Sequence, residues 1–105
     1  MTRPLALADH NFKEEVLESK KPVLVDFWAS WCPPCKMVEP TVMALAKDLT
    51  GEVKMAKINV DQNPKSAFDY KIMGVPTFIV FKGGEEITRR IGAQSKEQLL
   101  DMLRE

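Results

Sequence analysis

The pair Cys32 and Cys35 follows the apolar run of residues 23–28, with two prolines between the cysteines. An apolar run with almost no polar position is typical of a central strand that is covered on both faces. A residue before proline is restricted away from helical backbone angles, so Cys32 and Pro33 are expected to lie outside a helix. Pro34 suits the first helical position, because no N–H donor is needed there. The sequence therefore predicts a strand, a short turn and a helix from about Pro34, with Cys32 at the helix mouth and Cys35 one turn inward.

The two thiols are the only ones in the chain, and their spacing favours redox chemistry over a structural role. A disulfide across so short a loop removes little conformational freedom from the unfolded chain, about 2 kcal/mol, so it would be a weak staple. A structural zinc site needs four ligands, whereas this chain offers two cysteines and His10. A metal or iron–sulfur site would need thiolates from a second chain. The pair is best interpreted as a dithiol that closes to an internal disulfide or attacks an external one.

Length and charge limit the architecture and the partners. The 105 residues predict a single domain over residues 1–105. Lys plus Arg equals Asp plus Glu at 15 each, so nothing indicates a nucleic acid or an anionic membrane as partner. The N-terminus is charged too early to be a signal peptide, and no apolar stretch is long enough to span a membrane. We expect a cytoplasmic protein that acts as a monomer.

Hydrophobic spacing and capping signals divide the chain into strands and helices. Asn11 with Glu14 resembles a capping box, and Ser95 with Gln98 repeats that pattern before the last helix. Alternating strands and helices, followed by a hairpin and a helix, predict an α/β fold with a mixed central sheet and helices on both faces. The cysteines then lie at the carboxyl end of a central strand, where such sheets place reactive sites. The first expected helix is capped by Asp9 or Asn11 and runs to about Ser19. The other expected elements are strand 23–28, a helix from about 34 to 50 that contains Pro40, strand 53–58, a helix from Asn63 and Pro64 to about Tyr70, strands 77–81 and 86–91, and a helix from Ser95.

Three segments together resemble the thioredoxin family: Trp28-Ala29-Ser30-Trp31-Cys32-Pro33-Pro34-Cys35-Lys36, Gly74-Val75-Pro76-Thr77 and Gly92-Ala93. Their order and spacing match over essentially the whole chain. The resemblance implies the thioredoxin fold and a thiol-disulfide oxidoreductase that reduces disulfides in client proteins. It also implies electrons from a thioredoxin reductase-like flavoprotein and no cofactor beyond the reversible disulfide. One departure is that the family usually has Gly-Pro between the cysteines, where this chain has Pro-Pro.

The resemblance and the expected geometry assign roles to the site residues. Cys32 is expected to attack the client disulfide as a thiolate favoured by the helix N-terminus, and Cys35 to resolve the mixed disulfide. Asp26 is expected to be a buried acid with a raised pKa that takes a proton from Cys35, with Lys57 nearby. The alternatives are an acid that reaches solvent and an exposed strand lysine. Pro76 is expected to follow a cis bond, and Trp28 to support the site from the core. The expected substrate-binding surface comprises Trp31, Pro34, Met73, Gly74, Val75, Pro76, Gly92 and Ala93, with a core position as the alternative for Met73 and Val75.

Because of Pro33, the sequence leaves open whether the protein mainly reduces disulfides or acts as a more oxidising enzyme. It removes a backbone donor that glycine would supply near the Cys32 sulfur, so we hypothesise that the Cys32 pKa is no lower than in a Pro33→Gly variant. A more oxidising oxidase or isomerase, or an engineered family variant with an altered redox poise, would also fit the motif. Two alternatives come from other classes of protein: a binding module that does not use its thiols, and a dimer bridged by a metal or an iron–sulfur cluster.

Overall fold

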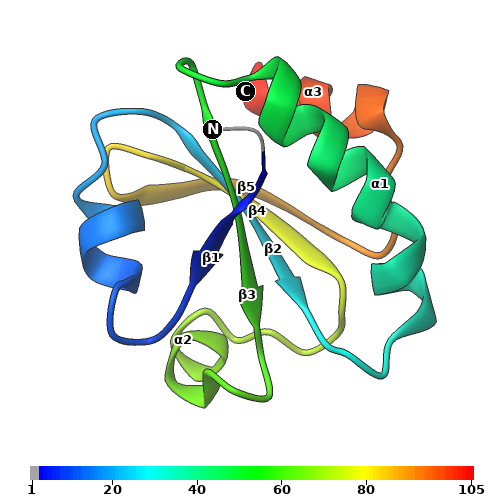
Figure 1. Ribbon diagram of the computed structural model, residues 1–105. Coiled ribbons are helices and arrows are strands. Elements are labelled where there is room, and N and C mark those ends of the chain that lie inside the picture. Colours follow the sequence, from blue (N-terminus) through cyan, green and yellow to red (C-terminus); the bar gives the residue numbers. More distant parts are fainter. Residues whose placement is uncertain (1–2) are drawn as a thin grey trace.

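The computed structural model describes residues 3–105, which form a mixed five-stranded sheet with helices on both faces (Figure 1). The strand order is β1-β3-β2-β4-β5, in which β1, β3 and β2 run parallel and β4 and β5 are antiparallel to their neighbours. The predicted fold class is confirmed. The elements in chain order are β1 (Leu5–Leu7), the π-helical segment η1 (Lys13–Leu17), β2 (Val23–Trp28), α1 (Pro33–Asp48), β3 (Lys54–Asn59), α2 (Pro64–Asp69), β4 (Thr77–Lys82), β5 (Glu85–Ile91) and α3 (Lys96–Leu103).

Successive side chains of the central strand β2 point to opposite faces of the sheet and build two apolar cores. Val25 and Phe27 pack in the core on the side of η1, whereas Leu24 packs in the core formed with α1 and α3. Figure 1 shows α1 and α3 together on one side of the sheet, with η1 and α2 on the other. Asp26 and Trp28 share the face of Leu24. The carboxyl of Asp26 is therefore directed to the side that α1 covers.

Cys32 is the N-cap of α1, with φ −98° and ψ 109°. This is the extended conformation expected for a residue before proline. The helix begins at Pro33, so the predicted start at Pro34 is wrong by one residue. The fixed φ of proline suits the first helical turn, and neither proline needs an N–H there. The helix continues through Pro40 and ends before Gly51, whose φ of +89° lies in the left-handed region.

The segment after β1 differs from the prediction. The expected capped helix to Ser19 is a short π-helical segment, η1, whose N-terminus has no side-chain cap among the described residues. Asn11 Oδ1 instead accepts a hydrogen bond from the Ala8 N–H at 2.8 Å and closes the preceding turn. In η1 the Glu18 N–H donates to the Lys13 carbonyl at 2.9 Å, across five residues. The prediction is wrong because a local side chain–backbone bond occupies the residue that was expected to cap the helix.

The remaining helix starts are fixed in two different ways. The predicted capping box of α3 is confirmed, with Gln98 N donating to Ser95 Oγ at 3.1 Å and Ser95 N to Gln98 Oε1 at 2.8 Å. Asn63 precedes α2 as predicted, but its side chain accepts from Asp9 N at 2.9 Å and does not cap the helix. The Asp9 carboxylate takes that role by accepting from Ser66 N at 2.8 Å. The start of α2 is therefore held by a residue far away in the sequence.

Candidate active site

Cys32 and Cys35 form a disulfide at the start of α1, with their Cα atoms 5.3 Å apart. The Cys35 N–H donates to the Cys32 sulfur at 3.2 Å, so this sulfur satisfies one of the donors that a helix N-terminus leaves unpaired. Both residues are buried in this oxidised state, Cys32 with 2% and Cys35 with 6% of the surface exposed. Exposure therefore does not distinguish them. Helical position does, because a negative charge on the N-cap sulfur faces the positive end of the helix dipole.

The loop before β4 lies against the Cys32 sulfur. The Val75–Pro76 peptide bond is cis, as the sequence predicts. The Val75 carbonyl oxygen lies 3.6 Å from Cys32 Sγ, although 43 residues separate the two along the chain. The Gly92 N–H donates to the Pro76 carbonyl at 2.8 Å. The fold thus brings the segment 74–77 against the disulfide of the segment 28–36. The hydrogen bond from Gly92 joins the segment 92–93 to the segment 74–77.

Asp26 is buried within β2, with 2% of its surface exposed, and the solvent-reaching alternative is wrong. Its Oδ1 forms no hydrogen bond with another described residue. Burial raises the pKa of Asp26 to about 7, while the charge of Lys57 lowers it and that of Glu39 raises it. Lys57 is the register partner of Asp26 on β3, and its Nζ lies 4.7 Å from the centroid of the Trp28 ring. The carboxyl therefore exchanges its proton near neutral pH, which is typical of functional sites.

A small cavity of about 140 Å³ is lined by both Asp26 and Cys35. Glu39 also lines it, and its Oε1 lies 3.5 Å from Lys57 Nζ. Glu39 follows Cys35 by four residues, so both lie on one face of α1; this spacing was the signal that could have identified Glu39 from the sequence. The cavity has ionisable side chains in its lining and room for water, and water there can carry a proton between the thiol and the carboxyl. The other lining residues are Trp28, Ser30, Lys36 and Lys57.

Several large apolar side chains near the cysteine motif are exposed. Trp31 is 66% exposed, and its indole N–H donates to Asp61 Oδ2 at 2.8 Å. Met73 is 94% exposed and is not in the core, whereas Val75 is half-buried against the cysteine pair. Phe68, on α2, is 83% exposed and lines with Met73 a surface hollow of about 500 Å³. No sequence pattern singled out Asp61 or Phe68. Of the other expected surface residues, Pro34 and Ala93 are exposed, Gly74 and Gly92 are half-buried, and Pro76 is buried.

Comparison with known proteins agrees with this geometry. The chain matches the family model for thioredoxin over residues 3–105. A thioredoxin from Rickettsia conorii is 50% identical over 95 residues, which cover 90% of each chain. Thioredoxin 1 from Nostoc sp. is 45% identical over 103 residues, covering 98% of this chain and 96% of the relative. A thioredoxin from Buchnera aphidicola is 44% identical over 105 residues, covering 100% and 97%.

A cysteine pair in the first turn of a helix, at the end of a central strand of this sheet, defines a redox-active dithiol protein. The chain belongs to the thioredoxin family, and it is a protein thiol-disulfide oxidoreductase. Within residues 3–105, no group of three or more His, Cys, Asp or Glu side chains is placed to hold a metal ion. None of the helices in that part of the chain has the length and apolar character needed to cross a membrane.

Proposed function

We propose that this oxidoreductase reduces disulfides in client proteins, with Cys32 as the nucleophile and Cys35 as the resolving thiol. The observation that carries this assignment is the N-cap position of Cys32, whose sulfur accepts the Cys35 N–H at 3.2 Å. The positive end of α1 stabilises a thiolate at that position. Cys35 lies within the first helical turn and lines the cavity beside Asp26. This position supports Cys35 as the thiol that acts second.

The proposed exchange moves two electrons from the dithiol to the client. The Cys32 thiolate attacks one sulfur of the client disulfide, and the other client sulfur leaves as a thiolate that takes up a proton. The Cys35 thiolate then attacks the Cys32 sulfur of the mixed disulfide, so the second client thiolate leaves and the Cys32–Cys35 disulfide forms. The second step is intramolecular. Its two thiols are one helical turn apart, and this proximity favours it over attack by an external thiol.

Asp26 is proposed to accept the Cys35 proton, with Lys57 as a positioning residue. A carboxyl with a pKa of about 7 is matched to proton transfer at neutral pH. The cavity of about 140 Å³ that both residues line supports a path for the proton from the thiol to the carboxyl. Lys57 holds a positive charge beside Asp26 and limits the rise of its pKa that burial causes.

The client is proposed to bind over the Cys32 side of the disulfide. Support comes from the exposure of Trp31 and Met73 and from the approach of the Val75 carbonyl to 3.6 Å from the Cys32 sulfur. An extended client segment that pairs with the Val75 backbone would bring its own sulfur to Cys32. Pro33 is proposed to tune the redox poise. The full proposed surface comprises Trp31, Pro34, Met73, Gly74, Val75, Pro76, Gly92 and Ala93.

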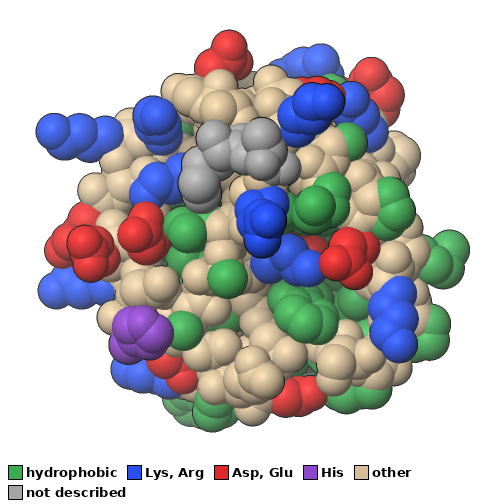
Figure 2. All heavy atoms as spheres, in the orientation of Figure 1, with side chains coloured by type: hydrophobic (Ala, Val, Ile, Leu, Met, Phe, Trp, Pro, Cys, Tyr) green, Lys and Arg blue, Asp and Glu red, His purple; other side chains and the backbone are tan. Residues whose placement is uncertain are grey.

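The remaining assignments depend on the family and on composition. Thioredoxins act on disulfide substrates with thioredoxin reductase as the reductant, and we propose a reductase of that type as the electron donor here. We further propose one domain over residues 1–105 that works as a cytoplasmic monomer, with the reversible disulfide in place of a cofactor. Positive and negative side chains are interspersed on the face seen in Figure 2, and the formal net charge is zero. Neither suggests a nucleic acid or a membrane as partner.

The test uses the full chain and insulin as a disulfide-bonded protein substrate. The parent protein is expected to accelerate the reduction of insulin by dithiothreitol, and neither single cysteine variant should do so. Cys35→Ser retains the nucleophile without the resolving thiol, so it should accumulate a mixed disulfide with insulin on non-reducing gels. Cys32→Ser is the matched control and should accumulate far less.

Two results would contradict the proposal. Insulin reduction no faster than with dithiothreitol alone would exclude the reductase function, and preferential trapping by Cys32→Ser would reverse the roles of the thiols. The role of Asp26 is measured separately, as the rate at which client leaves a preformed mixed disulfide. Asp26→Asn should slow that release by up to about 100-fold near neutral pH, while the first attack by Cys32 stays unchanged.

A further inference from the structure

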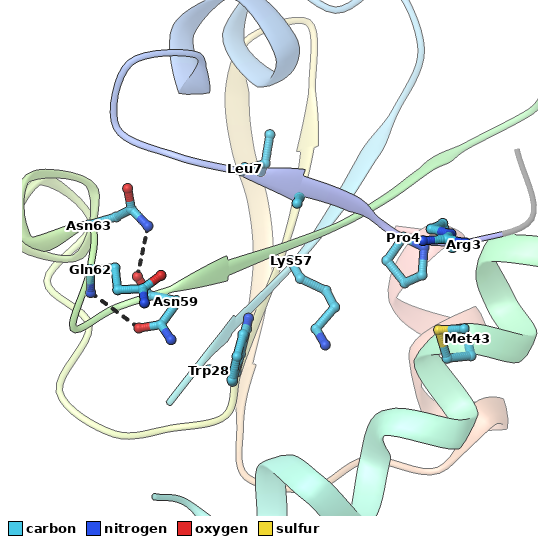
Figure 3. A pocket seen from close by; sticks show the side chains of 10 residues that line it. Arg3, Pro4, Leu7, Trp28, Met43, Lys57, Asn59, Gln62 and Asn63 are labelled. Carbon is cyan, nitrogen blue, oxygen red and sulfur yellow. Dashed lines mark hydrogen bonds between the residues drawn. The ribbon is translucent and has the colours of Figure 1, made fainter. Parts of the chain in front are cut away.

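A cleft of about 480 Å³ lies between the β1 edge of the sheet and α1, and neither cysteine lines it (Figure 3). Its sheet side is formed by Ala6, Lys57 and Trp28, from the neighbouring strands β1, β3 and β2. Met43 projects from α1 on the other side. Ala6 is small and exposed, so no large side chain bridges the edge strand and the helix. The volume falls within the range of small-molecule sites.

The described lining of this cleft contains two cations, Arg3 and Lys57, and no carboxylate. Arg3 is exposed and forms no ion pair with another residue in the described part of the chain. Lys57 is 3.5 Å from Glu39, which lies outside the cleft. An anionic group in the cleft would therefore meet two positive charges, one of them without an internal partner.

Aromatic and apolar surface accompanies these charges. The Trp28 ring is half-buried, and Figure 3 shows it beside the Lys57 side chain, whose Nζ lies 4.7 Å from the ring centroid. Asn59 Oδ1 accepts from Gln62 N at 3.2 Å and so holds the polar end of the cleft in place. A flat apolar body fits beside an indole ring in such a site, with polar groups fixing its orientation. The remaining lining residues are Pro4, Leu7 and Asn63.

We propose that this cleft binds a small organic anion with a flat apolar body. Its carboxylate would be shared by Lys57 and Arg3, and its body would lie against Trp28 and Met43. Charge complementarity favours an anion over a neutral or cationic molecule of the same shape, and the size of the cleft suits a small molecule. This binding site is separate from the thiol chemistry and goes beyond the proposed function.

Lys57 and Trp28 also line the inner cavity beside Asp26, so they form a wall common to the two spaces. An anion that pairs with Lys57 offsets the positive charge that faces Asp26, and this raises the pKa of the carboxyl. Occupancy of the cleft is thereby expected to change proton exchange at Asp26. Among the described residues, the charged groups that line the cavity with Asp26 are Lys57 from β3 and Lys36 and Glu39 from α1. Cys35 also lines it but does not titrate while it is in the disulfide, and the register partner of Asp26 on β4 is the apolar Phe78.

The test is a titration of the oxidised full chain, labelled with ¹³C and ¹⁵N, with 2-naphthoate and with its neutral counterpart 2-naphthamide. Naphthoate is expected to shift the Trp28 indole and the Asn59 and Gln62 side-chain amide signals in a saturable way. Naphthamide should bind at least about tenfold more weakly, which corresponds to about 1.4 kcal/mol. At saturation, the pH midpoint of the Asp26 carboxyl signal should rise.

Three variants locate the site. Arg3→Gln should weaken naphthoate binding about threefold or more, because it removes one of the two charges. Ala6→Phe should abolish binding by filling the cleft, and exposure of this position on an edge strand makes the larger side chain tolerable. Arg90→Gln, on β5 at the opposite edge of the sheet, is the matched control and should bind naphthoate like the parent.

Equal binding of naphthoate and naphthamide would overturn the proposal, as would unchanged binding by Arg3→Gln or by a folded Ala6→Phe. Shifts centred on the neighbouring hollow lined by Lys21, Lys54 and Met55 would assign the anion to a different place. Saturable binding that leaves the pH midpoint of the Asp26 carboxyl signal unchanged would show that Lys57 is not the partner of the naphthoate carboxylate. An absence of shifts at millimolar naphthoate would exclude the site altogether.

Discussion

Asp26→Asn is expected to stabilise the oxidised protein, and to stabilise it more as the pH rises. The carboxyl is 2% exposed, and its Oδ1 has no hydrogen-bond partner among the described residues. Burial of an ionised carboxylate is costly, whereas the neutral acid is tolerated. Asparagine has nearly the same shape and does not ionise. The pH-dependent part of the difference between the two proteins therefore reports on the ionisation of Asp26.

The size of the effect follows from a pKa of about 7 in the folded chain against the ordinary value of 3.8. Because the folded-state value is the higher one, the folded protein holds the proton more tightly, and ionisation favours unfolding. The acid causes no loss of stability below the ordinary pKa. The loss in the free energy of unfolding grows as the pH rises towards 7 and is complete above that value. Its full size is about 4 kcal/mol, because a difference of one pKa unit corresponds to about 1.4 kcal/mol. Between about pH 5 and about pH 8.5, the advantage of Asp26→Asn should grow by about 2.5 kcal/mol.

The assay is urea unfolding of both proteins at these two pH values, without reductant, with linear extrapolation to zero urea. Asp48→Asn is the control for the same substitution at an exposed carboxyl. A hydrogen bond from Lys96 lowers the pKa of Asp48, so this group titrates below the tested window. The stability difference of the Asp48→Asn protein should therefore be the same at both pH values.

An equal advantage of Asp26→Asn at both pH values would mean that the carboxyl of folded Asp26 is already ionised below about pH 5, as it is in the unfolded chain. That result is expected if the Lys57 charge outweighed burial, and it would refute the argument that desolvation dominates at this carboxyl. A larger advantage at the lower pH would also refute it, because a raised folded-state pKa makes the advantage grow as the pH rises.

Three further predictions use the same protein. Lys57→Met removes the charge that lowers the pKa of Asp26, so the pH at which the advantage of Asp26→Asn stops growing should shift upward in that background; a urea series extended to higher pH measures this, and a downward shift would contradict it. Pro33→Gly should not raise the pKa of the Cys32 thiol, which a thiolate absorbance titration of the reduced protein measures; a clearly lower value in the native protein would exclude the hypothesis. Ser95→Ala breaks the capping box of α3 and should cost about 1 kcal/mol in urea unfolding, while Ser95→Thr should keep most of that stability.

Features that depend on local chemistry were predictable from the sequence. The apolar run before the cysteines predicts β2 because a strand covered on both faces needs apolar side chains on both. Ser95 and Gln98 predict the start of α3, since both partners of the capping box lie within one turn. The proline after Cys32 predicts its extended backbone. The position of Asp26 in an apolar strand was enough to suggest a buried acid, although the family resemblance was needed to prefer that interpretation.

Features that depend on distant residues were not predictable in this way. Asp9 caps α2 across 57 residues of sequence, and the Trp31 indole donates to Asp61 across 30. Neither partner carries a local signal, because a lone aspartate in a loop fits many roles. The same holds for the cleft beside α1. It exists because the small side chain of Ala6 lies opposite Met43, and this juxtaposition arises only when the strand order places β1 outside β3.

The two free edges of the sheet have a consequence for clients that are partly unfolded. Exposed strand edges invite further strands to add, which leads to aggregation. Here β1 has only 3 residues, and β5 carries Arg89 and Arg90 and is paired to β4 through an irregularity near Val80. Short length and charge make both edges poor templates for an added strand. An unfolded client is therefore not expected to add as a strand at either edge of the sheet. Its backbone contact with the protein is then limited to the proposed site at Val75.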